Sequence, residues 1–229
     1  MSALYLTIDQ FLRGEGIFAT ILPAQVSPRE QAWAQLRFIV VCGCIYGAVM
    51  GSFGGLTWRS VHQILVSATK VPLLFLVTFL LCVPSFYVMN ALSGLHADFL
   101  RVLNALLGFQ SLAAIVLAAL GPITWLMNVS TTLYPFIVLW NGLMFGVASF
   151  CGHFMLRKLY RPLVTSNPRH ALLQKVWIVL YTFVGIQMAW VLRPFIGAPG
   201  MPVQFFRQEA WGNAYVQVLE LILRVFQHR

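Results

Sequence analysis

Six polar side chains lie within otherwise apolar stretches of this 229-residue chain, and they are the first candidates for chemistry: Asn90, Asn104, Gln110, Asn141, His153 and Gln187. Amide and imidazole groups are costly to place in hydrocarbon. They therefore either make hydrogen bonds between helices or line a path for a ligand or proton. Interhelical hydrogen bonding is the simpler interpretation, and a polar path is the alternative.

Residue patterns typical of catalysis are absent from the sequence. It has no helical two-histidine metal motif, no Gly-x-Ser-x-Gly nucleophile elbow, no phosphate-binding glycine loop and no closely paired acids. The chain has six acidic residues and none lies within an apolar stretch, so a carboxylate proton relay lacks its groups. The cysteines lie within apolar stretches and predict neither disulfides nor a metal site: Cys42, Cys44, Cys82 and Cys151. We expect a protein that is not an enzyme and that has no metal or cofactor.

The composition indicates an integral membrane protein. The chain is 59% hydrophobic and 9% charged with a mean hydropathy of +0.80, whereas soluble domains are about 25% charged. The net charge of +9 comes from basic residues in short segments between apolar stretches, which favours anionic lipid headgroups over nucleic acid as the partner. The basic residues expected to contact headgroups are Arg157, Lys158, Arg161, Arg169, Lys175, Lys70 and Arg193.

Five apolar stretches have the length that a membrane-crossing helix needs, about 20 residues. They cover residues 36–56, 71–92, 102–123, 133–155 and 174–193. The predicted fold is an all-α, single-domain bundle of five transmembrane helices spanning residues 1–229. The first helix should begin at Pro28, because Ser27 and Glu30 form a capping-box pattern around a proline at the first helical position.

Connections and terminal segments complete this layout. We expect loops at 57–70 and 124–132, the latter without charge and beginning after Pro122. Residues 3–13 and 209–227 have an apolar and a polar helical face, which predicts an interfacial amphipathic helix at each terminus. Charged residues in the second of these would cost about 2.5–3.5 kcal/mol each at the bilayer centre, so we expect it to lie on the surface.

Glycines give the clearest helix-packing signal. Four of them are spaced four residues apart in the first stretch, so they share one helical face: Gly43, Gly47, Gly51 and Gly55. A smooth face of this kind lets a neighbouring backbone approach closely. Gly142 and Gly146 form a similar face in the fourth stretch, which we expect to pack against the first one. A partner subunit or a second copy is the alternative occupant.

The distribution of positive charge predicts the orientation. Nine of the fifteen Lys and Arg residues lie in the N-terminal segment and in the segments around 93–101 and 156–175, and six lie on the other side. The positive-inside rule therefore places the N-terminus in the cytoplasm and the C-terminus outside a bacterial inner membrane. Asp98 and Arg101, one helical turn apart, should pair at the cytoplasmic edge.

The five-span layout with an amphipathic N-terminus resembles the bacterial relatives of the Yip-type (Ypt-interacting protein) membrane proteins. The Asp-Leu-Tyr-Gly-Pro motif of that family is absent, so the resemblance is one of layout. Segments 70–74, 190–197, 205–207 and 212–215 also resemble uncharacterised bacterial multi-pass proteins. These resemblances carry over no activity or catalytic residues. From the layout we expect a non-catalytic scaffold or accessory subunit of a membrane complex, whose glycine face and terminal helices contact lipids and other subunits or further copies. A small transporter or channel whose path is lined by amides is the alternative.

Overall fold

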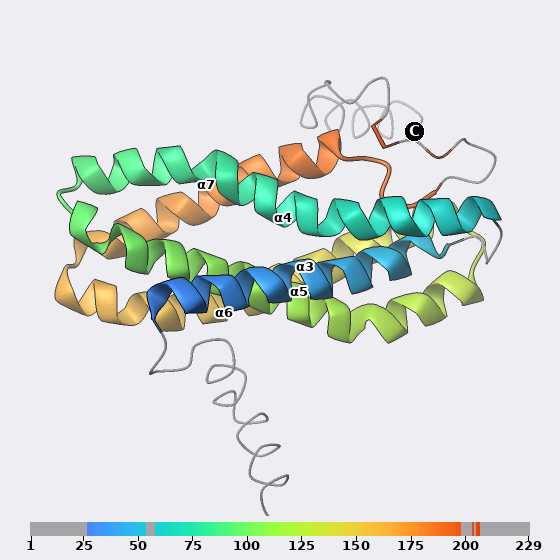
Figure 1. Ribbon diagram of the computed structural model, residues 1–229, viewed down its shortest axis with the longest axis horizontal. Coiled ribbons are helices and arrows are strands. Elements are labelled where there is room, and N and C mark those ends of the chain that lie inside the picture. The colour runs from blue at the N-terminus through green and yellow to red at the C-terminus, as the bar shows by residue number, and fades with distance from the viewer. Residues whose placement is uncertain (1–26, 54–57, 198–202, 204, 207–229) are drawn as a thin grey trace, which may run out of the picture.

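The computed structural model describes residues 27–53, 58–197, 203 and 205–206. These residues form five α-helices and one short 3-10 helix, with no strand among them: α3 (Pro28–Gly51), α4 (Trp58–Leu92), η1 (His96–Asp98), α5 (Phe99–Ser130), α6 (Tyr134–Ser166) and α7 (Arg169–Val191). Figure 1 shows an elongated bundle in which the long helices run side by side. Five helices are long and apolar enough to cross a membrane. For the described residues, the prediction of an all-α fold with five such helices is confirmed.

The start of α3 follows the predicted capping box. The Ser27 side-chain hydroxyl accepts a hydrogen bond from the Glu30 backbone N–H at 3.3 Å, and the Ser27 N–H donates to the Glu30 carboxylate at 3.2 Å. Both bonds satisfy donors that the first helical turn leaves without an intrahelical partner.

Two predicted loops are helical, so the helices are longer than the predicted spans. α4 begins at Trp58 and continues through Pro72 and Pro84, so the loop expected at 57–70 is wrong. α5 continues through Pro122 to Ser130, which shortens the expected loop at 124–132 to a connection of residues 131–133. A proline removes one backbone donor, whereas ending a helix leaves several groups unpaired. In an apolar segment, leaving several backbone groups unpaired at a helix end costs more free energy than losing the one donor at a proline.

The predicted glycine face of α3 packs against α4. A Cβ atom added at Gly47 would meet the Ser67 carbonyl oxygen and would lie 2.8 Å from Ala68 Cα, and one at Gly51 would lie 2.7 Å from Ile64 Cα. A Cβ at Gly43 would lie 3.2 Å from Pro72 Cα. The helix backbones are therefore in contact along this face, as the spacing predicts. Gly55 lies outside the described residues.

The expected pairing of this face with Gly142 and Gly146 is wrong. Both residues are exposed, and a Cβ at either would meet nothing within 4 Å. The glycine of α6 that packs inside the chain is Gly152, where a Cβ would lie 2.9 Å from the Phe109 ring of α5. The regular spacing of Gly142 and Gly146 identifies a smooth face but not its neighbour, and here that face points out of the bundle. The predicted terminal helices, 3–13 and 209–227, lie outside the described residues.

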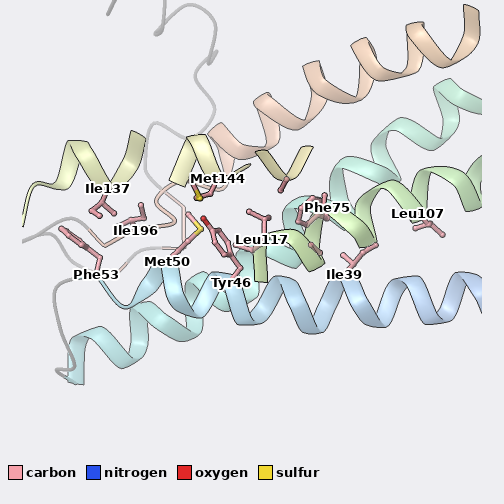
Figure 2. Close-up of a cluster of buried hydrophobic side chains, with 14 residues drawn as sticks. Ile39, Tyr46, Met50, Phe53, Phe75, Leu107, Leu117, Ile137, Met144 and Ile196 are labelled. Atoms are coloured by element: carbon pink, nitrogen blue, oxygen red, sulfur yellow. The ribbon is translucent and has the colours of Figure 1, made fainter. Parts of the chain in front are cut away.

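Two hydrophobic clusters hold the helices together. One joins α3, α4, α5 and α6 and includes Ile39, Tyr46 and Leu117, all fully buried. Figure 2 shows that Ile196, from the segment after α7, lies in this cluster near Ile137. The second cluster lies at the other end of the bundle, where the Trp177 ring stacks on Phe86 with centroids 4.8 Å apart.

Candidate functional site: a groove between α6 and α7

The segment after α7 turns back into the bundle and is held there by one polar face of α4. Lys70 Nζ donates to the carbonyl oxygen of Pro194 at 2.7 Å. The Ser67 hydroxyl donates to the carbonyl oxygen of Phe195. Gln63 Nε2 lies 3.3 Å from that same oxygen and donates to the Ser67 hydroxyl at 2.9 Å. Residues 63, 67 and 70 stand on one side of α4 because a helix repeats every 3.6 residues.

Lys70 is fully buried in this arrangement. Besides the Pro194 carbonyl, its ammonium group faces the Phe205 ring, with Nζ 5.1 Å from the ring centroid. The predicted contact of Lys70 with lipid headgroups is therefore wrong. An ammonium group can stay charged when buried if hydrogen bonds and aromatic ring faces replace water. Here the Pro194 carbonyl and the Phe205 ring provide these contacts.

The returning segment closes one end of a groove with a cavity volume of about 640 Å³. α6 and α7 form its two sides, and Met50 of α3 with Leu74 and Phe75 of α4 contributes to its lining. Val138 and Ile186, on the two sides, are 45% and 46% exposed, so the groove opens on the outer surface of the bundle. A volume of this size lies within the range of about 300–1,000 Å³ found for small-molecule sites.

Most of the lining is apolar, with a few polar groups at defined places. The Asn141 side chain accepts a hydrogen bond from the Tyr46 hydroxyl and donates one to the Ile137 carbonyl, both at 2.9 Å. Thr78 is 1% exposed, and its hydroxyl has no hydrogen-bond partner within the described part of the chain. Ser149 and Thr182 add two exposed hydroxyl side chains.

Within the described part of the chain, one cation lines the groove and belongs to the returning segment. The guanidinium carbon of Arg193 lies 3.0 Å from the centroid of the Trp190 ring, and Nε donates to the Trp190 carbonyl oxygen at 3.2 Å. Stacking on an aromatic face fixes the plane of a guanidinium group. Arg193 is half-buried and belongs to the same segment that Lys70 and Ser67 hold.

The structure does not bring the six predicted polar residues together. Asn141 lines the groove, whereas Gln110 donates to the Tyr181 hydroxyl at 2.7 Å, and Asn90 donates to the Phe86 carbonyl of its own helix at 2.8 Å. Asn104, His153 and Gln187 are half-buried and are not part of the groove lining. The bonds of Gln110 with Tyr181 and of Asn141 with Tyr46 each join two helices, as the packing interpretation expects, whereas the Asn90 bond stays within α4.

The predicted basic contacts are mostly accessible, and the predicted ion pair is present. The exposed members of the headgroup set are Arg157, Lys158, Arg161, Arg169 and Lys175. Arg101 lies 3.4 Å from Asp98, and the other carboxylate oxygen of Asp98 lies 3.3 Å from Nε2 of the buried His170. Asp98 thus joins the start of α5 to the start of α7.

Sequence reasoning missed Gln63 and Ser67, because we expected a loop at 57–70. A signal was available in their spacing, since Gln63, Ser67 and Lys70 recur at i, i+4 and i+7 beside a run of apolar residues. That pattern predicts a helix with one polar face. Its carbonyl partners, more than 120 residues later in the chain, leave no such local signal.

Comparisons of the chain with protein-family models, with curated proteins and with solved structures gave no match. A function can therefore be inferred only from the chemistry of the site. Among the described residues, the groove lining contains no His, Cys, Asp or Glu, and no three such side chains are grouped to hold a metal ion. What the groove offers is a long apolar surface with one cation at its end.

Proposed function

We propose that this chain is a non-catalytic multi-pass protein of the bacterial inner membrane that holds a lipid-like apolar molecule in the groove between α6 and α7. In this role it acts as an accessory subunit or scaffold of a membrane complex, with its N-terminus in the cytoplasm. The five long apolar helices support the membrane location. The layout shared with Yip-type proteins favours a non-catalytic role.

The observation that carries this proposal is the groove itself. Its cavity of about 640 Å³ has a mostly apolar lining and opens between exposed apolar side chains of two membrane-length helices. In a bilayer that opening would face hydrocarbon, so an acyl chain could enter from the side without crossing water. A water-soluble substrate would have no such approach.

The groups in the lining support a non-catalytic role. Among the described residues, the polar side chains of the lining are hydroxyls, one amide and the Arg193 guanidinium, and none is a carboxylate, imidazole or thiol. The transporter alternative has a path lined by Asn90, Asn104, Asn141 and Gln187, and of these four amides Asn141 alone is among the described residues that line the groove. A solute flux in reconstituted vesicles that disappears in Asn141→Ala would favour the transporter.

The exposed face of α6 is where we place a partner subunit or a second copy. Gly142 and Gly146 leave open space on this face, and Leu139, Leu143 and Phe150 beside them are more than half exposed. Small residues next to large apolar ones are typical of helix association within membranes. Lipids are the remaining partners, and we propose no contact with nucleic acid.

Filling the groove tests the proposal. Gly142 lines the groove and a Cβ there meets nothing within 4 Å, so Gly142→Phe should occupy the cavity without disturbing the backbone. Gly146→Phe is the matched control, because Gly146 lies one turn along α6 and is not part of the lining. The readout is crosslinking of an uncharged photoactivatable diacylglycerol, mapped to peptides of α6 and α7.

We expect Gly142→Phe to lose most of this crosslinking and Gly146→Phe to retain it. Equal crosslinking in both variants and in the parent, or crosslinks that map away from α6 and α7, would show that the groove holds no lipid-like ligand.

A further inference from the structure

We propose that the groove holds a prenylated quinone, whose carbonyl oxygens accept hydrogen bonds from hydroxyl groups of α4, α6 and α7 and whose apolar tail leaves between α6 and α7. This inference rests on the proposed function, because it names the chemical class of the molecule in the same groove. An apolar molecule without carbonyl oxygens would satisfy the proposed function, so the inference can fail on its own.

Four hydroxyl-bearing residues from three helices line the part of the groove farthest from the returning segment. They are Thr78 of α4, Ser149 of α6, and Tyr181 and Thr182 of α7. Thr78, Ser149 and Thr182 lie 13 to 17 residues from the end of α4, the end of α6 and the start of α7, respectively, and these three termini lie on the same side of the bundle (Figure 1). At 1.5 Å per residue this range corresponds to roughly 6 Å. The three helices therefore present hydroxyl groups at a similar height in the groove.

Thr78 gives the strongest indication of a ligand. Its side chain is 1% exposed, and its hydroxyl has no hydrogen-bond partner within the described part of the chain. A buried hydroxyl without a partner lowers the stability of a fold. The methyl group of Thr78 faces α7, since a Cβ added at Gly185 would lie 3.7 Å from it, and Gly185 also lines the groove. Rotation about the Cα–Cβ bond brings the hydroxyl to the position of this methyl group, where it can meet an acceptor in the groove.

Tyr181 supplies a second donor. Its hydroxyl accepts a hydrogen bond from Gln110 Nε2 at 2.7 Å, so its own hydrogen is left for another acceptor. Ser149 and Thr182 add exposed hydroxyls on the α6 and α7 sides of the groove. The two carbonyl oxygens of a quinone point from opposite edges of its ring and can accept from both sides. An acyl chain has no acceptor along its length, and a simple alcohol has only one polar group.

Aromatic side chains surround these hydroxyls. Phe75 and Phe145, each about one helical turn from one of the hydroxyl residues, line the groove with ring centroids 6.4 Å apart. The rings of Phe109 and Tyr181 meet edge to face at 5.6 Å and line it as well. Aromatic rings pack favourably on one another in offset or edge-to-face arrangements. A planar conjugated ring therefore suits this part of the groove better than a flexible chain does.

The remaining lining suits an isoprenoid tail. It is mostly apolar between the hydroxyls and the returning segment, and a Cβ at Gly142 meets nothing within 4 Å, so space is open there. Val138 and Ile186 border the opening and are about half exposed. In a bilayer a tail leaving at this point passes directly into hydrocarbon.

Binding of decylubiquinone to the purified full chain in detergent tests the inference, with quenching of tryptophan fluorescence as the readout. A matched probe has the same ring and tail with hydrogens in place of the two carbonyl oxygens, and its ability to displace the quinone is measured. The variants are Thr78→Val, which keeps the side-chain shape, Thr78→Ser, which keeps the hydroxyl, and Tyr181→Phe, which keeps the ring. Thr69→Val is the control, because Thr69 is an exposed residue of the same helix whose hydroxyl donates to the Leu65 carbonyl.

We expect saturable binding to the parent, Thr78→Ser and Thr69→Val, and affinity weaker by about fivefold in Thr78→Val and in Tyr181→Phe. The unfolding temperature of Thr78→Val should be unchanged or higher, because the lost hydroxyl has no partner among the described residues. A purely structural role of Thr78 would not combine retained stability with weaker binding. Parent-like affinity in Thr78→Val overturns the inference, whether or not Tyr181→Phe folds. Absence of saturable binding to the parent, or equally strong binding of the probe without carbonyl oxygens, also overturns it.

The two proposals fail differently. Absence of quinone binding, with uncharged diacylglycerol still crosslinked in the groove and lost in Gly142→Phe, leaves the proposed function standing and removes this inference. Loss of both signals removes both proposals. Crosslinks from the groove to another protein chain would identify a helix as its occupant and also overturn the quinone assignment.

Discussion

The ammonium nitrogen of Lys70 lies 2.7 Å from the carbonyl oxygen of Pro194, 124 residues further along the chain. This bond connects the middle of α4 to the segment that closes the groove. It places a fully buried charge, together with the Ser67 hydroxyl one turn away, against the segment that closes the groove. The position of Arg193 therefore depends on a residue of a different helix.

Replacing Lys70 with Met should loosen the end of the groove. The change leaves the Pro194 carbonyl without this donor, and an unsatisfied buried acceptor costs about 1–3 kcal/mol. The measurement is thiol labelling of a cysteine placed at Ile196, which is 4% exposed, in a background without the native cysteines. Labelling should be faster in Lys70→Met and unchanged in the control Lys175→Met, an exposed lysine of α7. Equal rates would show that Lys70 does not hold the segment.

Gly47→Leu should separate α3 from α4. A leucine at this position would overlap the Ser67 carbonyl and Ala68 Cα, and overpacking costs about 1–3 kcal/mol or more. Insertion should be unaffected because leucine favours the membrane. We expect earlier elution in mild detergent and a lower unfolding temperature. Gly146→Leu is the control, since its Cβ would meet nothing within 4 Å. If both variants elute like the parent, the α3–α4 contact is not as close as described.

Asp98 should be coupled more strongly to His170 than to Arg101. His170 is fully buried, whereas the Arg101 side chain is 78% exposed. Exposed pairs contribute about 0–1 kcal/mol, and residues in direct contact through a hydrogen bond show coupling energies of about 0.5–3 kcal/mol. Double-mutant cycles with alanine at each position, measured by unfolding in detergent, give both values. A larger coupling for Arg101 would contradict the geometry.

Cysteine labelling tests the orientation. A single cysteine is introduced at Val129 or at Ser166 in a chain without the native cysteines. Both positions are exposed, and they lie at opposite ends of the helix pair α5 and α6. A membrane-impermeant maleimide added to intact cells should label Val129→Cys and leave Ser166→Cys unlabelled until the cells are opened. The reverse pattern would invert the orientation. Labelling of both from outside would contradict the number of crossings.

Local patterns predicted the parts of this fold that depend on nearby residues. The capping box at Ser27, the glycine face of α3 and the pair of Asp98 with Arg101 each involve residues within one or a few turns, and each is present. Apolar stretches likewise located all five helices. The helix boundaries predicted at prolines were wrong, because a proline such as Pro122 removes one donor without ending a helix that has apolar sequence on both sides.

Local sequence patterns could not predict the groove. Its lining comes from five different helices and from the segment after α7, and spacing within one helix does not report the distance to another. The same limit explains why Gly142 and Gly146 were assigned to the wrong neighbour. Lys70 was expected at the headgroups because its carbonyl partner lies far along the chain.

The length of α6 has a mechanical consequence. Its 33 residues extend for roughly 50 Å, while the hydrocarbon core of a bilayer is about 30 Å thick. If Tyr134 lies at one boundary of the hydrocarbon core, Arg157 lies roughly 35 Å along the helix, just beyond the opposite boundary. Lys158 and Arg161 follow in the same helix. A thicker bilayer would draw Arg157 toward hydrocarbon and favour an upright helix, and a thinner one would favour tilting. We therefore expect the tilt of the bundle to change with bilayer thickness, which solid-state NMR in bilayers of different acyl length would measure.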